Sequence, residues 1–532
     1  MEQLSGLDAA FLAMETRTVF GHVGSVSIVD PSTAPEPLTF DRFTRVIESR
    51  LSLVPLFRRR LVDVPLGLDQ PYWIEDSDFD IEFHVRELAL PSPGDDRQLA
   101  EQIARLHARP LDRSRPLWEI YLISGLKDGR MAFYNKVHHA AIDGVSGNDI
   151  FAAMLDLTPE GRDLPPAVRP SEEPPSSLYL LARSALSLAG HPVRAAKVAA
   201  SLLKLAPGVV SAVAAMVPFL GSGQDENADA VLSPTGLRAP HTPFNATITQ
   251  HRRWAFADVP LAEVKKIKNT AGLTVNDVVM ALCTGALRRW LDDHRALPSS
   301  PLVAAVPVSV RTEDQKGTHG NRVSMMFAGL ATQLADPQDR LRATHEAMRA
   351  AKEQHGAIPA SLLADVSQFA APLLANQAWR LSARLRLVER VSPFNLIISN
   401  VPGPNVPLYC AGAELQAYYP VSAITDGQGM NITVMSYRDR LYFGLIACRE
   451  LVPDIETLAG YLTDELHVLA DAVAQAGPAR KAAVQKAVPA VKTAPVKKAV
   501  PAKNAVPVKK VAPAKKATPV KKAQRRSRTV TQ

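Results

Sequence analysis

Two apolar, β-rich runs stand close together in the chain, WEIYLISGL at residues 118–126 and MAFYNKVHH at residues 131–139. Lys127-Asp128-Gly129 lies between them, and an Asp-Gly pair between two such runs is a strong signal for a β-hairpin. The second run ends in two adjacent histidines, His138 and His139. The sequence therefore predicts a hairpin whose second strand ends at a pair of imidazoles.

The length and composition favour a globular protein of two domains. The chain of 532 residues is too long for one ordinary core, and its 46% hydrophobic and 21% charged residues are typical of chains that bury one. The three cysteines, Cys283, Cys410 and Cys448, are far apart and lack CxxC spacing. This spacing excludes a disulfide scaffold or a zinc ribbon and fits a reducing compartment.

Neither a secretory signal nor a membrane-spanning helix is expected. The N-terminus, MEQLSGLDAAFLAMET, contains acidic residues and no basic segment ahead of an apolar one. The most apolar long stretch, residues 202–220, is interrupted by a lysine, a glycine and two prolines. Such interruptions argue against a helix that spans a bilayer.

The composition changes along the chain predict four parts. Residues 1–160 alternate strand-like and helix-like patterns and form an N-terminal domain. Residues 161–240 begin as a Pro- and charge-rich linker and continue as a helical segment with basic residues among Leu, Ala and Val. That segment is either an interfacial helix on a lipid surface or a connector packed on the protein. Residues 241–475 form a second mixed domain, and residues 476–532 form a tail.

Three segments of the second domain have clear patterns. TVNDVVMALCTGALRRWL, residues 274–291, predicts a helix with Asn276 and Asp277 at its N-terminal end. PLVAAVPVSVR, which ends at Arg311, and FNLIISNVPG, residues 394–403, predict buried strands. In residues 1–160, the segment GNDIFAAMLDL after Gly144 predicts a further helix.

The tail differs from the rest of the chain in charge. Residues 480–532 contain 16 Lys and Arg and no acidic residue, which leaves 45 basic against 53 acidic residues elsewhere. A mildly acidic body therefore precedes a strongly basic, Lys/Ala/Pro/Val-rich tail, and that composition predicts disorder. The tail either keeps the protein soluble or attaches it to an anionic surface, lipid or nucleic acid.

The sequence HHAAIDG from His138 to Gly144 admits three interpretations: a strand end in the core, a metal site, or a proton-transfer device. Neighbouring strand residues point to opposite faces, and the chain has no further His/Cys cluster nearby, so we predict no metal. Histidine accepts a proton near neutrality because its ordinary pKa is about 6.5. The chain contains neither a GxSxG elbow nor a Walker A motif, which disfavours a serine hydrolase and a P-loop enzyme.

HHAAIDG resembles the HHxxxDG signature of coenzyme A-dependent acyltransferases. Within that superfamily the chain is similar to the bacterial wax ester synthase/diacylglycerol acyltransferase family, of the kind found in actinobacteria. The same resemblance extends, in order, to the following segments: LSGLDAAFLAMET with Asp8, Phe11 and Glu15; HVGSVSI at His22; VPLFRRRL; Pro116-Leu117-Trp118; Asn276-Asp277; VPVSVR; and SNVPGP from Ser399. It covers roughly residues 3–475.

The resemblance implies a mixed α/β fold of two chloramphenicol-acetyltransferase-like domains with a tunnel between them. It implies that His139 takes the proton from the hydroxyl of diacylglycerol or a long-chain alcohol. The resulting oxygen then attacks the thioester of acyl-CoA without a covalent acyl-enzyme. Acyl-CoA is the expected co-substrate, and no permanently bound cofactor is expected. We also expect a cytoplasmic protein, peripheral to the inner membrane face or to lipid inclusions.

The remaining site residues follow from the same resemblance. The catalytic set is His139, His138, Asp143, Gly144 and Asn276: Asp143 pairs with an arginine, for which Arg311 is one candidate, and Asn276 either donates to the oxyanion or caps its helix. The predicted substrate-binding set is Pro116, Leu117, Trp118, Glu15 and Asp277. Arg58, Arg59 and Arg60 either contact CoA phosphates or form a solvated basic face.

Two alternative functions remain open at this stage. The first is an HHxxxDG acyltransferase that esterifies a polyketide or a sugar lipid. The second is a non-catalytic protein that binds a lipid surface or nucleic acid through its tail. The intact HHAAIDG, Pro116-Leu117-Trp118 and Asn276-Asp277 motifs favour an enzyme.

Overall fold

The computed structural model describes residues 1–65, 69–142, 153–162, 164, 175–176, 178–183, 239–309, 323–355 and 393–475. The described residues all belong to one compact unit, Met1–Gly477. The expected disordered tail, the helix after Gly144 and most of the helical segment at residues 161–240 lie outside the described residues.

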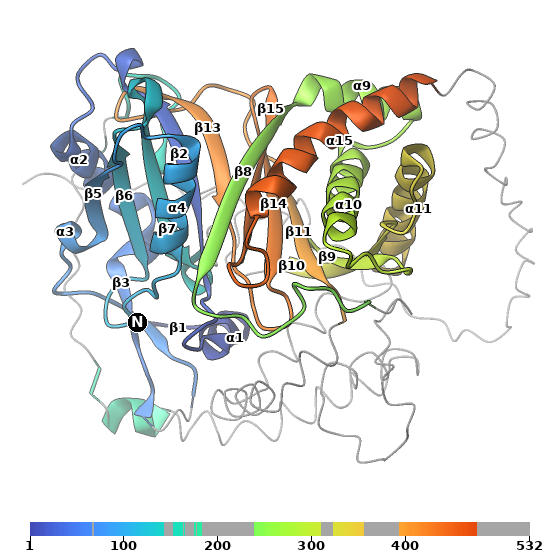
Figure 1. The fold of residues 1–532 in the computed structure, drawn as a ribbon. Coiled ribbons are helices and arrows are strands. Elements are labelled where there is room, and N and C mark those ends of the chain that lie inside the picture. The colour runs from blue at the N-terminus through green and yellow to red at the C-terminus, as the bar shows by residue number, and fades with distance from the viewer. Residues whose placement is uncertain are drawn as a thin grey trace, which may run out of the picture. The chain divides into compact units, whose positions relative to one another are not determined.

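Two six-stranded sheets form the core of this unit (Figure 1). The strand order in the first sheet is β12-β13-β2-β7-β6-β5. Its strands are β2 (His22–Asp30), β5 (Val85–Ala89), β6 (Trp118–Ser124), β7 (Met131–His138), β12 (Tyr409–Cys410) and β13 (Ala413–Val421). The described pairs are antiparallel except for β5 with β6.

The predicted hairpin is confirmed. Strands β6 and β7 pair antiparallel, with Trp118 opposite Val137 and Ile123 opposite Ala132. The connection contains Asp128 at φ 64° and Gly129 at φ 72°, the left-handed conformation that this dipeptide tolerates. His138 is the last residue of β7, as the pattern predicts.

The second sheet has the order β10-β9-β11-β14-β15-β8. Its strands are β8 (Arg252–Pro260), β9 (Leu302–Ser309), β10 (Val323–Leu330), β11 (Leu396–Val401), β14 (Met430–Tyr437) and β15 (Arg440–Cys448). β11 lies between β9 and β14 and is parallel to both. The buried strands predicted around residues 301–311 and 394–403 are thus confirmed as β9 and β11.

The strands of the first sheet do not all come from residues 1–160. β12 and β13, from far along the chain, complete it, and β13 pairs antiparallel with β2 over Gly24–Asp30 (Figure 1). Trp254 of β8, which is buried, donates from Nε1 to the carbonyl of Pro420 at the end of β13, at 3.2 Å. The two sheets therefore pack against each other. One cluster of buried apolar side chains contains residues from both halves of the chain, among them Trp118 and Trp254.

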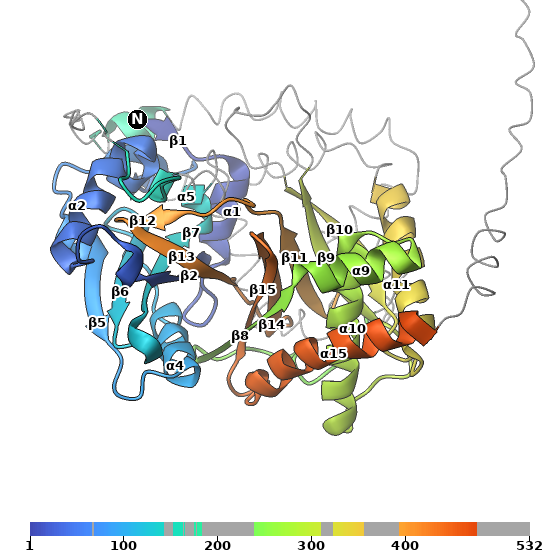
Figure 2. The ribbon, with the colours of Figure 1, turned by 90° about the horizontal axis from the view of Figure 1, so that it is seen from above.

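Helices α9 (Leu261–Ala271), α10 (Val275–Asp293), α11 (Pro337–His355) and α15 (Ile455–Gln475) lie together on the second sheet (Figure 2). α10 is the helix predicted from residues 274–291, and its long buried face packs against α15 and α11. Further helices in the described part of the chain include α1 (Gly6–Met14), α2 (Phe40–Arg50), α3 (Ile81–His84), α4 (Asp96–His107) and α5 (His139–Ile142). A small sheet of β1 (Glu2–Gln3), β4 (Tyr72–Glu75) and β3 (Arg59–Val62) lies near the N-terminus.

No single helix in the described part of the chain is both long and apolar enough to cross a membrane. Only α9 and α10 together pass by length and composition, and they are bent by 104° at the break between them. α10 is a largely buried core helix, which accounts for its apolar composition.

Candidate active site

The two histidines occupy the junction between β7 and α5, and different segments bind their backbones. The N–H of His138 donates to the carbonyl of Leu117 at 2.9 Å, and the N–H of His139 donates to the carbonyl of Gly21 at 2.8 Å. In the ladder of β2 with β7, His22 lies opposite His138. The chain thus leaves the sheet at His138, and His139 begins a new helix over the end of β2.

The hydrogen bonds of His138 define which ring nitrogen carries the hydrogen. Its Nδ1 accepts from the N–H of Ala140 at 3.1 Å, so Nε2 is the donor nitrogen. Nε2 lies 3.2 Å from Oε1 of Glu15. The side chain is only 1% exposed, so His138 is enclosed in this arrangement and cannot face bulk solvent.

Glu15 follows the last turn of α1, and its carboxylate accepts hydrogen bonds from three segments of the chain. Its Oε1 accepts from the N–H of Gly21 at 2.9 Å as well as from His138. Its Oε2 accepts from Nε of Arg113 at 3.1 Å and from Nη2 at 2.7 Å. Burial alone would raise the pKa of Glu15, but the hydrogen bonds from His138 and Gly21 and the Arg113 charge lower it to about 2.

The ring of His139 lies against Phe11 of α1. It stacks on Phe11 with 4.0 Å between ring centroids and 21° between the planes. Nδ1 is buried without a partner in another described residue, and the ring interacts with its own backbone carbonyl. Burial, with a smaller contribution from His138, lowers the pKa of His139 to about 4. The imidazole is therefore uncharged at neutral pH.

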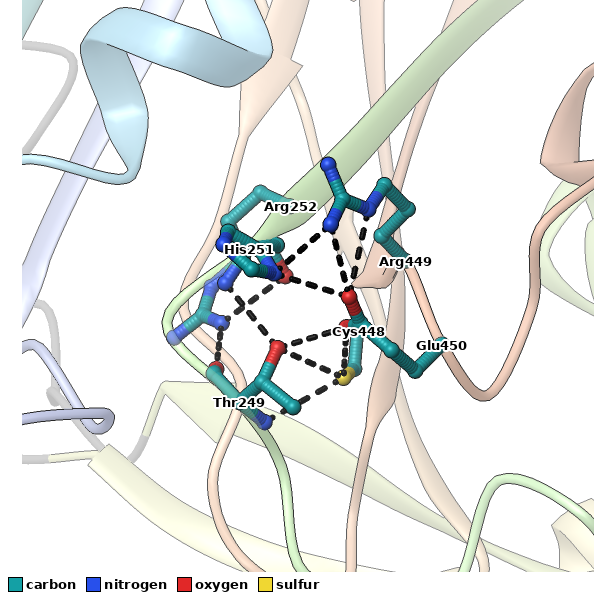
Figure 3. A network of polar contacts seen from close by, with 6 residues as sticks. All are labelled: Thr249, His251, Arg252, Cys448, Arg449 and Glu450. Carbon is teal, nitrogen blue, oxygen red and sulfur yellow. Dashed lines mark hydrogen bonds and ion pairs between the residues drawn. The ribbon is translucent and has the colours of Figure 1, made fainter.

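A buried arginine from the second sheet contacts the segment between α1 and β2. Arg252, the first residue of β8, donates to the carbonyl of Thr18, and its guanidinium lies 5.4 Å from the Phe20 ring centroid. Figure 3 shows its other partners, the carbonyls of Thr249 and His251. Nearby, Glu450 accepts from Arg449 at 2.9 Å and lies 2.8 Å from Nδ1 of His251. The second half of the chain thus restrains the loop that supplies Gly21.

Pro116, Leu117 and Trp118 reach the site through one backbone group. The Leu117 carbonyl accepts from His138, as described above. The Trp118 side chain is fully buried, stacks on Phe57 at 4.7 Å and on His84 at 4.5 Å, and donates from Nε1 to the carbonyl of Phe57 at 2.7 Å. Trp118 therefore holds β6 in the core, beside the end of β7 that bears the histidines.

Asn276 and Asp277 lie at the start of α10, where Thr274 is the N-cap. Asp277 accepts from the N–H of Thr274 at 3.0 Å in a capping box, and its Oδ2 lies 2.9 Å from Nδ1 of His345. Capping and this ion pair account for the buried carboxylate. Because Thr274 caps the helix, the capping interpretation of Asn276 is wrong; its Oδ1 instead accepts from Nδ2 of Asn400 at 3.1 Å.

Two of the three consecutive arginines pair with acidic neighbours, and the third lies over an aromatic ring. Arg59 pairs with Glu2 at 2.8 Å and with Glu75 at 3.0 Å, and Arg60 pairs with Asp76 at 3.5 Å. The Arg58 guanidinium lies 5.3 Å from the ring centroid of Phe79. These pairs offset much of the positive charge of the run, and neither the contact with CoA phosphates nor the solvated basic face is tested by them. Asp143, Gly144 and Arg311 lie outside the described residues, so the predicted Asp143–arginine pair stays a prediction.

Several residues at this site do not belong to the predicted set. Phe11 lies within a segment that matches the family but carries no predicted role, and no motif marks Gly21, Arg113 or Arg252. Arg113 is 98 residues from Glu15 in sequence, and Gly21 gives no chemical signal of its own. Only the adjacency of Gly21 to the strand that starts at His22 could have directed attention to it.

Solved structures share this architecture. The wax ester synthase/diacylglycerol acyltransferase from Marinobacter aquaeolei superposes with a TM-score of 0.63 and 30% sequence identity, covering 89% of this chain and 100% of the other. The first condensation domain of the CDA synthetase gives a TM-score of 0.51 at 15% identity over 89% of this chain and 96% of its own. The second likeness shows the fold alone. It agrees with the two-domain α/β fold that the sequence predicts.

The comparisons of sequence define the family. The model of the wax ester synthase/diacylglycerol acyltransferase catalytic domain matches residues 4–279, and the model of the WS/DGAT C-terminal domain matches residues 319–470. A putative diacylglycerol O-acyltransferase of Mycobacterium tuberculosis is 36% identical over 88% of this chain and 90% of its own length. One of Mycobacterium bovis is 38% identical over 89% of this chain and its entire length. The chain belongs to the wax ester synthase/diacylglycerol acyltransferase family and is an acyltransferase.

Proposed function

We propose that this acyltransferase moves a fatty acyl group from acyl-CoA to the hydroxyl of diacylglycerol, forming triacylglycerol, or of a long-chain alcohol, forming a wax ester. Acyl-CoA is the co-substrate, and no permanently bound cofactor takes part. The family and the activity named for the mycobacterial relatives support the substrate classes. The observation that carries the proposal is the uncharged imidazole of His139 at the end of β7.

His139 is the general base of the proposed reaction. Its pKa of about 4 leaves the ring unprotonated at neutral pH, as a base must be. Nδ1 is buried without a hydrogen-bond partner in another described residue, and the proposed reaction uses the tautomer with the hydrogen on Nδ1. In that tautomer Nε2 has the lone pair that accepts the proton.

The proton and electron movements balance without a covalent enzyme intermediate. Nε2 of His139 takes the hydroxyl proton as the acceptor oxygen forms a bond to the thioester carbonyl carbon. The tetrahedral intermediate collapses, the C–S bond breaks, and the imidazolium returns its proton to the CoA sulfur. An imidazolium with a pKa near 4 is a strong enough acid for this last step, because an ordinary thiol has a pKa of about 8.5.

The oxyanion of the tetrahedral intermediate needs a hydrogen-bond donor. Asn276 is the proposed donor, since Asn400 bonds to its Oδ1 and thereby leaves the NH₂ group of Asn276 to donate. Asn276→Ala is expected to lower kcat more than it raises the KM for acyl-CoA. Unchanged kcat would exclude Asn276 from the oxyanion site.

The proposed acceptors are lipids, so we further propose that the enzyme works at a membrane or lipid-inclusion surface. Residues 178–183 form a short helix on which Leu178 and Tyr179 are exposed, 77% and 50%. Flotation with anionic and neutral vesicles tests this location, and a protein that stays with neither would contradict it.

The direct test of function uses purified full-length protein, radiolabelled acyl-CoA and a panel of acceptors. The panel contains diacylglycerol, long-chain alcohols, a polyketide alcohol and a sugar lipid, with products separated by chromatography. Ester formation with diacylglycerol or a long-chain alcohol is expected. Products confined to the polyketide or sugar lipid would overturn the proposed acceptor class.

The same assay tests the base. His139→Ala is expected to remove nearly all ester formation, and His138→Ala is expected to lose less. His467→Ala, on the exposed side of α15, is the matched control and should retain parental activity. Full activity of His139→Ala, or equal losses in the two neighbouring variants, would contradict the assignment of His139.

A further inference from the structure

The carboxylate of Glu15 is fully used by the protein itself. A carboxylate offers about four lone-pair sites. Here Oε1 accepts from Gly21 and His138, and Oε2 accepts two hydrogen bonds from Arg113. The Glu15 side chain is 15% exposed, so little water competes for these sites. No acceptor capacity is left for a substrate hydroxyl, which argues against the substrate-binding role that the sequence suggested for Glu15.

The bonds to Glu15 lead to His139 by two separate routes. The first passes through one residue, because Gly21 donates its N–H to Glu15 and accepts the N–H of His139 at its carbonyl. The second passes through His138, whose Nε2 faces Glu15 and whose Nδ1 accepts the N–H of Ala140. The residues directly before and after His139 are therefore tied to the same carboxylate.

The helix that ends at Glu15 also contacts the imidazole itself. Phe11 lies one turn earlier on α1 and stacks on the ring of His139. Arg113 contacts the end of the same helix, because its Nη2 donates to the carbonyl of Leu12 at 2.6 Å as well as to Glu15. Arg113 thus fixes the carboxylate and the helix end together.

We propose that Glu15, held by Arg113, is a positioning residue that orients His139 through Gly21 and His138. The inference rests on the proposed function, in which His139 is the base. In this role Glu15 affects the position of the His139 ring and takes no part in proton transfer. Displacing a catalytic group by about 1 Å can cost on the order of 10²-fold in rate.

The test compares kcat and KM in the full-length enzyme. Glu15→Ala is expected to lower kcat about 10²-fold while the KM values for acyl-CoA and the acceptor change less than about twofold. Glu15→Gln keeps the size and one acceptor oxygen but loses the charge, so its kcat should lie between those of Glu15→Ala and the parent. Added formate should restore part of the kcat of Glu15→Ala, because the small anion can occupy the vacated site.

A double variant tests the proposed route. If Glu15 acts partly through His138, Glu15→Ala combined with His138→Ala should lose much less than the product of the two single losses. Multiplicative losses would show that the two side chains act independently and would overturn that route. Arg113→Ala should reproduce the loss of kcat in milder form.

The matched control is the exposed pair Arg438–Glu414, with a distance of 2.7 Å, on β13 and the turn after β14. Glu414→Ala should leave kcat at the parental value and should not respond to formate. A Glu15→Ala enzyme with raised KM and spared kcat would instead make Glu15 a substrate contact. Unchanged kinetics would exclude positioning. Activity of His139→Ala in the same assay would overturn the proposed base independently of these outcomes.

Discussion

The phenyl ring of Phe11 covers the imidazole of His139 face to face, with 4.0 Å between the ring centroids. Phe11 belongs to α1 near the start of the chain, whereas His139 follows the predicted hairpin. The contact removes one face of the imidazole from water. Because a charged imidazolium is disfavoured when it is desolvated, this packing contributes to the pKa of about 4.

The first prediction concerns the pH dependence of kcat/KM. His139 must be uncharged to accept a proton, and its fraction in that form falls as the pH drops through about 4. The value of kcat/KM should therefore stay constant between about pH 8 and about pH 5. It should fall to half of its maximum near pH 4. Measurements with a soluble acyl-CoA, and circular dichroism at each pH, separate this limb from unfolding. A half-maximal value near pH 6.5 would contradict the lowered pKa of His139.

The second prediction is that substitution of Phe11 changes the pH at which kcat/KM declines on the acid side. Phe11→Ala exposes the imidazole to water, so the pKa of His139 should rise towards its ordinary value of about 6.5. The acid limb of kcat/KM should shift upward in pH by the same amount. Phe83→Ala, which removes a ring that packs on His84 instead, is the control and should not shift it.

The third prediction uses the close approach of Gly21 to His138. A Cβ at residue 21 would lie 2.5 Å from Nε2 and 3.0 Å from Cε1 of His138. Gly21→Ala must therefore push the imidazole of His138 away from Glu15, and kcat should fall at least about tenfold. Gly460→Ala is the matched control, because a Cβ added there would meet no atom within 4 Å apart from the neighbouring backbone of α15. There alanine should stabilise the helix by up to about 1 kcal/mol and leave kcat unchanged.

Local pattern was enough to predict the elements that bear the histidines. The Asp-Gly turn and the two apolar runs specify the β6–β7 hairpin, and the long apolar helix α10 follows from its own periodicity. These features depend on neighbours within a few residues. The end of β7 at His138 follows from them directly.

Long-range partners could not be predicted in the same way. An alternating strand pattern does not say which sheet a strand joins, so β13 was expected in the second domain although it pairs with β2. Likewise the carboxylate of Glu15 finds Arg113 only because the fold brings α1 beside the segment before β6. For two predicted binding residues, the fold supplies partners within the protein that the sequence does not reveal. Asp277 takes part in the capping box of α10, and Arg59 pairs with Glu75, so ligand contacts of either side chain would compete with these interactions.

The fourth prediction concerns acid stability. His22 and His107 are buried, and burial lowers the pKa of each well below the ordinary 6.5. The folded protein therefore stays unprotonated at these rings while the unfolded chain takes up protons below about pH 6.5. Their contribution to stability is present above that pH and is lost as the pH falls, by roughly 1.4 kcal/mol per pH unit for each ring.

Urea denaturation midpoints between pH 7 and 5 check this expectation. Carboxylates titrate mainly below this window, so the histidines should dominate the slope. His107→Gln should be less stable at pH 7 but show a shallower decline with falling pH. A parental midpoint that does not change from pH 7 to 5 would contradict the assignment.

The last prediction concerns the basic tail, residues 480–532, which lies beyond residue 470, where the family models end. Its 16 positive charges occur without one acidic residue and are interrupted by prolines. Each Lys or Arg near an anionic membrane contributes about 1 kcal/mol, screened by salt, and duplex DNA attracts such a segment by counterion release. We propose that the tail acts on the location of the enzyme and not on its chemistry.

Deleting residues 480–532 should leave kcat with soluble acyl-CoA close to parental and weaken sedimentation with anionic vesicles or DNA at low salt. A full-length variant with the tail lysines changed to glutamine controls for chain length and should lose binding in the same way. Binding should decline steeply with salt in the parent only, because only the parent has the tail charges. If the truncated protein still binds both surfaces as well as the parent, the tail is not a tether. If it loses catalysis in free solution, the tail belongs to the folded enzyme.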